Sequence, residues 1–256
     1  MQLTNLPPPP PLSIIVPAYN EAATIARVLR ALDAALGPQC EIIVVDDCSA
    51  DGTAAAVQAL QAALPHVRLL RHAHNQGKTA ALKTGFAAST GAIVIVQDAD
   101  LEYDPQDISE VIGPIVRGDA DVVYGSRFLV RRAARVLYFR HYLANKFLTF
   151  YSNVLTDINL TDVETGYKAF RGEIIRNMII TSHRFGFEIE VTAKVAKLRC
   201  RIYEVPISYY GRTYEEGKKI GLRDGIEAIY YIARYNLFCS LRNSYRALPR
   251  LPRSQP

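Results

Sequence analysis

Short apolar runs alternate with helix-patterned segments along the first half of the chain, and this alternation constrains the fold more than any other feature. The apolar runs are predicted to form buried strands at 12–16, 41–45, 67–70, 92–96 and 121–124. The segments between them space apolar residues three and four positions apart, as on one face of a helix. The first such set is Ile25, Val28, Leu29, Leu32 and Leu36. Alternating strands and helices indicate an α/β fold, with a mostly parallel sheet covered on both faces.

Glycine, proline and capping residues mark the helix ends. Gly37-Pro38 stops the first helix, and Pro105 begins the helix before the fifth strand. Ser49 or Asp51 is expected to cap the helix that follows the second strand. Residues 77–88 should form a helix of small side chains that packs closely on the sheet.

The length and composition fit one large domain. The chain has 256 residues, of which 49% are apolar, enough for a full α/β core. We expect a single domain over 12–241. A proline-rich lead-in at 1–11 and a basic tail at 242–256 are both expected to lack fixed structure.

The sequence carries no pattern for export or membrane crossing. No apolar run reaches 18 residues, and the N-terminus lacks the basic and apolar regions of a signal peptide. Four cysteines share no metal-binding or redox spacing: Cys40, Cys48, Cys200 and Cys239. They are expected to be reduced thiols in a cytoplasmic protein.

The net charge of +5 is unevenly distributed. Segments 122–156 and 228–256 contain 11 of the 30 Lys and Arg residues and none of the 25 Asp and Glu residues. Basic segments that also carry apolar residues suggest an anionic surface as a partner. Nucleic acid is the competing partner, but no zinc-finger, basic-zipper or aromatic RNA-binding signature is present, so we expect none.

Asp98-Ala99-Asp100 is the strongest chemical signal. It directly follows the apolar run 92–96. Two carboxylates where a buried strand meets a loop suit a hard divalent cation, and Mg²⁺ is usually held by one or two carboxylates together with substrate phosphates. A solvated turn at a strand end is the alternative interpretation of an isolated D-x-D sequence.

Polar residues also follow the first two strands. Tyr19 and Glu21 come after the first strand, and Asp46 and Asp47 come after the second. In parallel sheets ligands bind beyond the carboxyl ends of the strands, so these residues should meet Asp98 at one edge. Two other nucleotide motifs are missing: no G-x-G-x-x-G follows the first strand, and the Gly-Lys-Thr at 77–79 lacks the earlier glycine of a P-loop.

In combination, these motifs resemble family 2 glycosyltransferases, and more narrowly the polyprenyl- and dolichyl-phosphate mannose and glucose synthases. The resemblance covers roughly 12–240 in colinear order. The matching segments are 16–21, 44–49 with 51–53, 75–78, 98–101, 125–128, Asp162 with 166–168, 205–208, and Arg212 with Lys218. It implies a GT-A-like, doubly wound sheet with C-terminal amphipathic helices.

The resemblance also implies roles for individual residues. Asp98 and Ala99 would contact the nucleotide, and Asp100 would bind Mg²⁺ or Mn²⁺ across the diphosphate. Asp98 and Glu102 are further candidate metal ligands, and mannose synthases often carry Gln at the position of Glu102. The remaining nucleotide-sugar contacts would be Pro17, Tyr19, Glu21, Val45, Asp46 and Asp47, with the phosphate-binding cations Arg127, Arg212 and Lys218.

The implied chemistry is a single in-line displacement at the anomeric carbon, with inversion and a lipid monophosphate as nucleophile. A phosphate monoester is largely dianionic at pH 7, so a strong general base is less necessary than with a hydroxyl acceptor. Arg127 is the candidate catalytic cation. Asp162 and Glu164 are the candidate base or orienting groups, and capping the helix near Arg171 or binding Lys168 is the alternative for both.

Segment 127–150 is expected to face the acceptor and the membrane. It interleaves basic, aromatic and aliphatic residues, as a helix in the lipid headgroup region does, although a core-packing helix with a basic outer side is equally compatible. The C-terminal helix, with Ile226, Ile229, Tyr230, Ala233 and Leu237, has the same two interpretations. We therefore expect a peripheral protein on the cytoplasmic face of the membrane.

Other functions stay open at this point. A family 2 enzyme with a soluble saccharide acceptor would share the donor site. A non-catalytic nucleotide-sugar or lipid-binding module is a different class, and the intact acidic and basic motif residues argue against it. A nucleotidyltransferase lacks its glycine-rich loop here. A processive polysaccharide synthase would need a Q-x-x-R-W motif, and the chain has no Trp.

Overall fold

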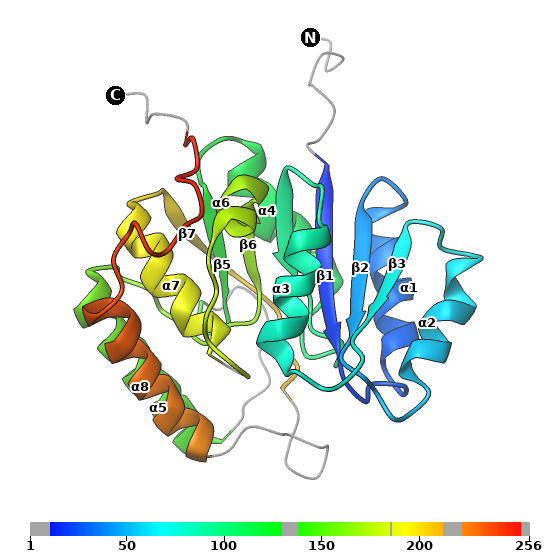
Figure 1. Ribbon diagram of the computed structural model, residues 1–256, viewed down its shortest axis with the longest axis horizontal. Coiled ribbons are helices and arrows are strands. Elements are labelled where there is room, and N and C mark those ends of the chain that lie inside the picture. The colour runs from blue at the N-terminus through cyan, green and yellow to red at the C-terminus, as the bar shows by residue number, and fades with distance from the viewer. Residues whose placement is uncertain (1–10, 130–137, 185, 212–221, 252–256) are drawn as a thin grey trace.

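A twisted sheet runs through the middle of the computed structural model, which describes residues 11–129, 138–184, 186–211 and 222–251 (Figure 1). Within those residues the sheet has seven strands in the order β3-β2-β1-β4-β6-β5-β7. All neighbouring pairs are parallel except those of β6, which is antiparallel to both β4 and β5. The strands are β1 (Leu12–Ala18), β2 (Glu41–Asp46), β3 (Val67–Arg71), β4 (Ile93–Val96), β5 (Val122–Ser126), β6 (Lys168–Arg171) and β7 (Ile202–Pro206).

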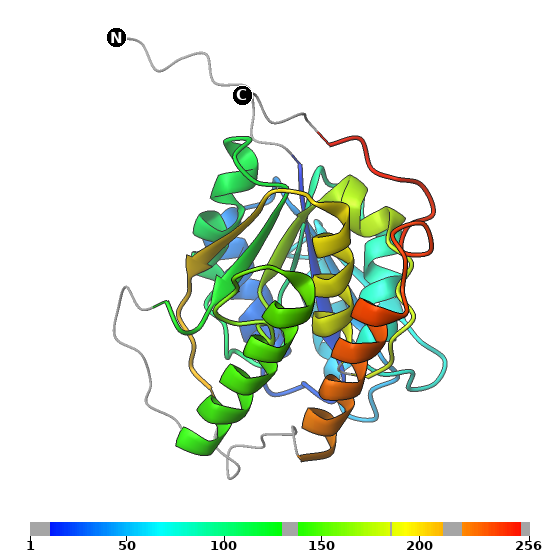
Figure 2. The ribbon, with the colours of Figure 1, turned by 90° about the vertical axis from the view of Figure 1, so that its left-hand side faces the viewer.

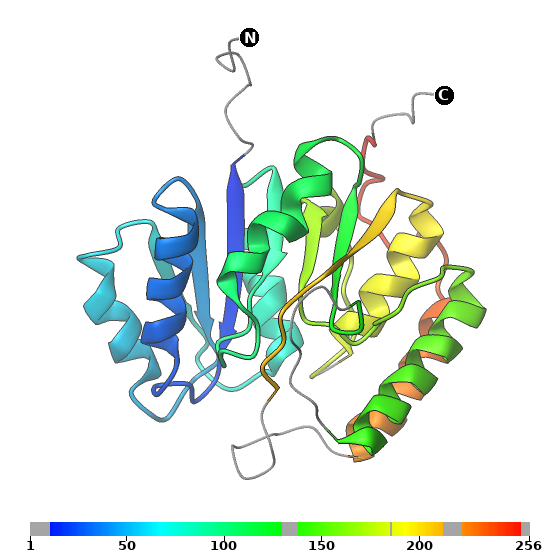
Figure 3. The same cartoon turned by 180° about the vertical axis from the view of Figure 1, so that it is seen from behind.

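Helices cover both faces of this sheet, as the alternating sequence predicts. One face carries α1 (Ile25–Leu36), α2 (Thr53–Gln61) and α4 (Ile108–Val116), which lie in front in Figure 3. The other face carries α3 (Lys78–Ala88), α6 (Gly172–Asn177) and α7 (Phe187–Leu198), which lie in front in Figure 1. The expected α/β architecture with helices on both faces is confirmed.

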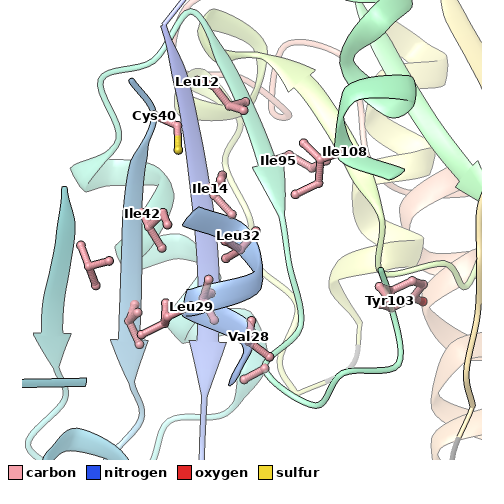
Figure 4. Close-up of a cluster of buried hydrophobic side chains, with 14 of the residues drawn as sticks. Leu12, Ile14, Val28, Leu29, Leu32, Cys40, Ile42, Ile95, Tyr103 and Ile108 are labelled. Carbon is pink, nitrogen blue, oxygen red and sulfur yellow. The ribbon is translucent and has the colours of Figure 1, made fainter. Parts of the chain in front are cut away.

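The strand residues divide between two cores because side chains alternate across a sheet. Ile14 and Ile42 pack with α1 and α4 on one face (Figure 4), whereas Ile15 packs under α3 on the other. Helix α3 approaches the sheet closely: a Cβ atom on Gly85 would lie only 2.3 Å from Cγ2 of Ile15. This contact explains the small side chains of the helix.

The helix starts differ in detail from the predicted ones. Pro105 begins a single 3-10 turn, η1 (Pro105–Asp107), that leads directly into α4. Helix α2 begins after Gly52, and Asp51 Oδ1 accepts a hydrogen bond from the Thr53 amide at 2.9 Å. Ser49 does not cap α2, because its hydroxyl accepts from the amide of Asn20 in the neighbouring loop.

Two long helices form an outer layer beyond α7. They are α5 (Phe139–Thr156) and α8 (Leu222–Leu237), and they lie side by side in Figure 2. Leu148 of α5 and Tyr231, Ile232 and Tyr235 of α8 pack in one buried cluster with Ile189 of α7. No helix of the described segments is long and apolar enough to cross a membrane.

The expectation that the chain after Arg242 lacks fixed structure is wrong for residues 242–251. Tyr245 is only 4% exposed, and its hydroxyl donates to the Lys194 carbonyl at 3.2 Å. The amide of Ile179 donates to the Ser244 carbonyl, and the amide of Arg246 donates to the Asn177 carbonyl. A buried tyrosine and paired backbone groups therefore fix this segment across α6 and α7. The lead-in 1–10 and the last residues 252–256 lie outside the described part of the chain.

Candidate functional site at the carboxyl edge of the sheet

The loops that follow β1, β2, β4 and β5 meet at one edge of the sheet, at the bottom of Figure 1. Because β2, β1 and β4 are adjacent and parallel, the loops that carry Asp47, Glu21 and Asp100 follow one another along this edge. Three non-glycine residues of these loops have positive φ angles: Asn20 (55°), Cys48 (61°) and Leu101 (64°). Such backbone requires support from its surroundings, and it often marks functional loops.

Hydrogen bonds join the first two loops into one unit. The Asn20 amide donates to Ser49 Oγ at 2.9 Å, and Asn20 Oδ1 accepts from the Ala50 amide at 2.9 Å. The Glu21 amide donates to Thr53 Oγ1 at 2.8 Å. Tyr19, which is 43% exposed, therefore lies beside a loop that these hydrogen bonds hold in place.

The acidic pair Asp46 and Asp47, at the end of β2, is buried and holds the neighbouring loops in place. Asp47 Oδ1 lies 2.6 Å from His72 Nδ1, and Asp47 Oδ2 accepts from the Gly77 amide at 2.7 Å, so this carboxylate anchors the loop that leads into α3. Asp46 forms an ion pair with Arg71 at 2.9 Å. Val45 is fully buried in the core under α3. Of the residues expected to line a nucleotide pocket, Pro17, Tyr19 and Glu21 offer accessible surface, whereas Val45, Asp46 and Asp47 are buried.

Lys78 links the loop after β4 to α7. Its ammonium group lies 2.9 Å from Asp98 Oδ1 and 3.1 Å from Glu188 Oε1. Burial opposes a charge on Lys78, but the carboxylates of Asp98 and Glu188 outweigh it and hold the pKa of the ammonium well above its usual range. Lys78 therefore stays charged and holds Asp98 in place.

The side chains of Asp100 and Glu102 follow in the same loop. Asp100 Oδ1 accepts from the Glu102 amide at 3.2 Å, and Glu102 Oε2 accepts from the Tyr209 hydroxyl at 2.8 Å. Ala99 between the two aspartates is only 3% exposed. In the described residues no three His, Cys, Asp or Glu side chains gather as a preformed metal cage. Mg²⁺ is usually held by one or two carboxylates together with substrate phosphates, and Asp98 and Asp100 could supply those carboxylates.

Arg127 and Asp162 form a bidentate ion pair beyond the end of β5. Arg127 Nε and Nη2 each donate to an Asp162 oxygen at 2.6 Å, and the Arg127 amide donates to the same carboxylate at 3.1 Å. Burial acts against the charge on Arg127, but Asp162 holds the pKa of its guanidinium well above the usual range. The Tyr209 ring packs against this group, with its centroid 5.2 Å from Arg127 Cζ. Both residues were candidates from the sequence, but their pairing was not predicted.

Residues 162–168 connect this ion pair to Asp98. A Cβ on Gly166 would lie 2.6 Å from Asp98 Oδ2, and the Gly166 amide donates to the Tyr103 hydroxyl at 2.8 Å. The Tyr103 ring stacks on Tyr167 with centroids 4.7 Å apart. One short segment therefore touches both the cationic and the acidic parts of the site.

Glu164 lies in the middle of this segment. Burial and the charge of Glu188 raise the pKa of its carboxyl, while Lys168 and Arg127 act in the opposite direction. Burial lowers the pKa of Lys168, whose ammonium group donates to the carbonyls of Val163 and Thr165. Glu164 Oε1 and Glu188 Oε2 are both buried and have no hydrogen-bond partner in the described structure.

Arg212 and Lys218 lie outside the described residues, as does the stretch 130–137 of the expected acceptor segment. Conversely, no role was expected from the sequence for Glu188 or Tyr103, and Lys78 appeared only in the matching segment 75–78 and in the rejected P-loop at 77–79. Glu188 carried a usable signal, since a carboxylate three and four positions before Val191 and Thr192 falls on the buried face of a helix.

Comparison with known proteins agrees with this arrangement. The model of the family described as "Glycosyl transferase family 2" matches residues 13–179. The undecaprenyl-phosphate mannosyltransferase of Micrococcus luteus is 31% identical over 233 residues, which cover 87% of this chain and 93% of the relative. The dolichyl-phosphate beta-glucosyltransferase of Dictyostelium discoideum is 30% identical over 82% of this chain and 68% of its own.

Solved structures give the same fold. Glucosyl-3-phosphoglycerate synthase from Mycobacterium tuberculosis, in its complex with uridine diphosphate, superposes with a TM-score of 0.69 at 20% identity. The superposition covers 88% of this chain and 80% of that one. At this identity the similarity establishes the fold alone, and it confirms the expected GT-A-like architecture.

Proposed function

The chain belongs to glycosyltransferase family 2, and we propose that it transfers a hexose from a nucleotide sugar to the phosphate of a polyprenyl phosphate. The observation that carries this proposal is the continuous polar edge from Glu21 through Asp98 and Asp100 to Arg127. Relatives about 30% identical over most of the chain are named for sugar transfer to undecaprenyl or dolichyl phosphate. The donors that we propose to test are GDP-mannose and UDP-glucose.

The donor nucleotide would lie over the loops after β1 and β2, with Tyr19 and Glu21 at its accessible rim. The buried residues Asp46 and Asp47 would act by holding those loops in shape. Mg²⁺ or Mn²⁺ bound by Asp98 and Asp100, with Glu102 as a further candidate ligand, would supply positive charge for the leaving diphosphate.

The acceptor phosphate would bind at Arg127. A guanidinium presents a planar fork of donors that matches phosphate oxygens, and Asp162 fixes the orientation of this fork. Because both oxygens of Asp162 are engaged by Arg127, we propose that Asp162 orients the cation. A phosphate nucleophile is already ionised at neutral pH, so the reaction does not require Asp162 to accept a proton. Arg212 and Lys218 stay candidates for further phosphate contacts.

An exposed apolar surface on the outer layer would bring the protein to its lipid substrate. We name it the α5–α8 surface, and it consists of Phe139, Tyr142, Leu143, Phe147, Phe150 and Val154 of α5 and Ile226, Ile229, Tyr230 and Leu237 of α8. Figure 2 faces this layer. Phe150, for example, exposes 67% of its surface to water. Contiguous exposed apolar residues mark an interaction surface.

We propose that an anionic membrane covers the α5–α8 surface. Arg140 and Arg234 are exposed on the same two helices, and residues 138–156 contain no Asp or Glu. Each basic residue near an anionic leaflet contributes about 1 kcal/mol to binding. The proposal makes the chain a peripheral protein of the inner, cytoplasmic membrane face, with a catalytic domain over 12–241 that receives its lipid beside 127–150.

Binding of the donor can be tested by thermal shift with GDP-mannose and UDP-glucose, each with and without Mn²⁺. One of the two should raise the melting temperature of the native chain, and Mn²⁺ should increase the shift. Asp100→Ala should abolish the metal-dependent part, whereas Asp104→Asn should keep it, because the Asp104 side chain caps η1 by accepting from the Gln106 amide. A full metal-dependent shift in Asp100→Ala would refute the metal role of Asp100.

A further inference from the structure

We infer that Glu164 and Glu188 form the subsite that accepts hydrogen bonds from hydroxyl groups of the transferred sugar. This inference rests on the proposed function and assigns a part of the site that the nucleotide, the metal and the acceptor phosphate leave unused. The ligand class is a neutral polyhydroxyl group, because two carboxylates repel a phosphate and accept from hydroxyl donors.

The positions of Glu164 and Glu188 relative to Arg127 and Asp98 support this inference. In an in-line displacement the sugar must lie between the leaving diphosphate and the incoming phosphate. Segment 162–166 spans these two ends, since Asp162 binds Arg127 and Gly166 abuts Asp98. Glu164 is the middle residue of that segment. Glu188 reaches the same place from α7, through its ion pair with Lys78 beside Asp98.

Each of the two carboxylates has one buried oxygen without a donor in the described structure. Glu188 is only 5% exposed, and its Oε1 binds Lys78 while its Oε2 has no partner in the described structure. Glu164 Oε1 is likewise buried and unpaired there. A buried acceptor without a donor costs about 1–3 kcal/mol, and more when it is charged. Hydroxyl groups of a bound sugar would donate to these oxygens and remove this cost.

The surroundings hold the two carboxylates in place without satisfying them. The Lys168 ammonium donates to the carbonyls of Val163 and Thr165 on either side of Glu164, and so fixes the backbone that presents it. Lys78 fixes one oxygen of Glu188 and leaves the other available. Elsewhere in α7 the arrangement differs: Glu190 accepts from the amides of Thr181 and Ser182 and from Lys194, so neither of its oxygens is left over. Glu190 is therefore a structural carboxylate and a matched control.

The test compares binding of a nucleotide sugar with binding of its nucleoside diphosphate, by calorimetry in Mg²⁺. The probes are UDP-glucose with UDP and GDP-mannose with GDP, and the informative pair is the one whose sugar form binds the native chain. Glu164→Ala, Glu164→Gln and Glu188→Gln should leave the diphosphate affinity within about twofold and weaken the sugar form at least about tenfold. Glu190→Gln should change the melting temperature but not the ratio of the two affinities.

Monodeoxy analogues of the sugar provide a second readout that a merely structural role would not move. Removing the sugar hydroxyl that donates to Glu164 should weaken binding of the nucleotide sugar to the native chain. The same removal should have no further effect on binding to Glu164→Ala. An unchanged affinity ratio in all three variants, or an equal loss for diphosphate and sugar form, would overturn the inference while leaving the proposed function intact. If neither nucleotide sugar binds the native chain, the proposed function fails and the subsite fails with it.

Discussion

Arg127 donates from Nε and Nη2 to the two carboxylate oxygens of Asp162, each at 2.6 Å, and Asp162 is completely buried. This pairing joins the two residues into one hydrogen-bonded unit. A fully engaged carboxylate is suited to orienting a cation, and the cation is suited to receiving the acceptor phosphate.

A double-mutant cycle on this pair tests the unit directly. Arg127→Lys and Asp162→Asn should each lower kcat/KM for polyprenyl phosphate by about 10- to 150-fold, the equivalent of about 1.5–3 kcal/mol for a hydrogen bond to a charged group. The double variant should lose little more than either single variant, because each change already breaks the same arrangement. Initial rates at varied acceptor concentration provide the measurement.

The opposite outcome would identify a different role for Asp162. Multiplicative losses in the double variant would mean that the two residues act separately. If Asp162 is a general base, Asp162→Asn should also remove the acidic limb of the pH profile of kcat, while Arg127→Lys keeps it.

The α5–α8 surface predicts a membrane-binding phenotype that is separate from catalysis. Phe147→Ser and Phe150→Ser should each weaken binding to vesicles of anionic phospholipid by at least about tenfold, since a buried aromatic side chain contributes about 1.5–3 kcal/mol. Flotation with anionic and with neutral vesicles, at low and high salt, measures this. Val116→Ser is the matched control, because Val116 is an exposed apolar residue of α4 on the opposite face of the sheet. Equal flotation of all three variants would reject the surface.

Asp121 predicts how stability responds to acid. It joins three strand ends, accepting from Arg171 Nε at 2.8 Å and from Arg201 Nη2 at 2.8 Å, as well as from the Arg201 amide at 3.0 Å. Burial alone would raise the pKa of Asp121, but the bonds from Arg201 and Arg171 lower it below its ordinary value. Asp121→Asn should reduce the free energy of unfolding at pH 7 by about 1.5–3 kcal/mol.

The sign of the pH dependence follows from linkage. Because the folded pKa lies below the unfolded value of about 3.9, the unfolded state binds more protons as the pH falls through that range. The difference between the native chain and Asp121→Asn should therefore be full above about pH 5 and shrink below pH 4. Urea unfolding from pH 7 to pH 3 measures it, with Asp119→Asn as an exposed control. A difference that stays constant down to pH 3 would contradict the assignment.

The first half of the fold could be predicted from sequence because its signals are local. Strands β1 to β5 are short apolar runs, and the positions of α1 and α3 follow from helical spacing and from Gly37 and Gly77. Strand β6 was not predicted: it has four residues, of which Lys168 and Arg171 are basic, and its partners β4 and β5 precede it by dozens of residues. Helix α7 alternates apolar and charged residues at its start. An ion pair to Lys78 of α3 allows Glu188 to be buried there, and an ion pair to Lys194, one turn further along α7, allows Glu190 to be buried.

In the candidate site, too, local signals could be predicted from the sequence and long-range contacts could not. The motifs placed Tyr19, Glu21, Asp98 and Asp100 at a common edge because the carboxyl ends of parallel strands must lie together. They did not indicate which carboxylates face inward. Asp47 anchors the loop before α3 and Asp162 anchors Arg127, and these contacts join residues 30 and 35 positions apart. The sequence left two interpretations of the apolar stripe of α8 open, and it could not separate them: Ile226, Tyr230 and Leu237 are exposed, whereas Tyr231 and Tyr235 pack in the core.

The most direct measurement is transfer of labelled hexose to undecaprenyl phosphate by the native chain, with GDP-mannose or UDP-glucose as donor and Mg²⁺ or Mn²⁺ present. We expect a polyprenyl-phosphate hexose product from one donor, a loss of at least about 100-fold in Asp98→Asn and Asp100→Asn, and near-native transfer by Asp104→Asn. Transfer only to soluble saccharide acceptors, or undiminished transfer by Asp98→Asn and Asp100→Asn, would contradict this expectation.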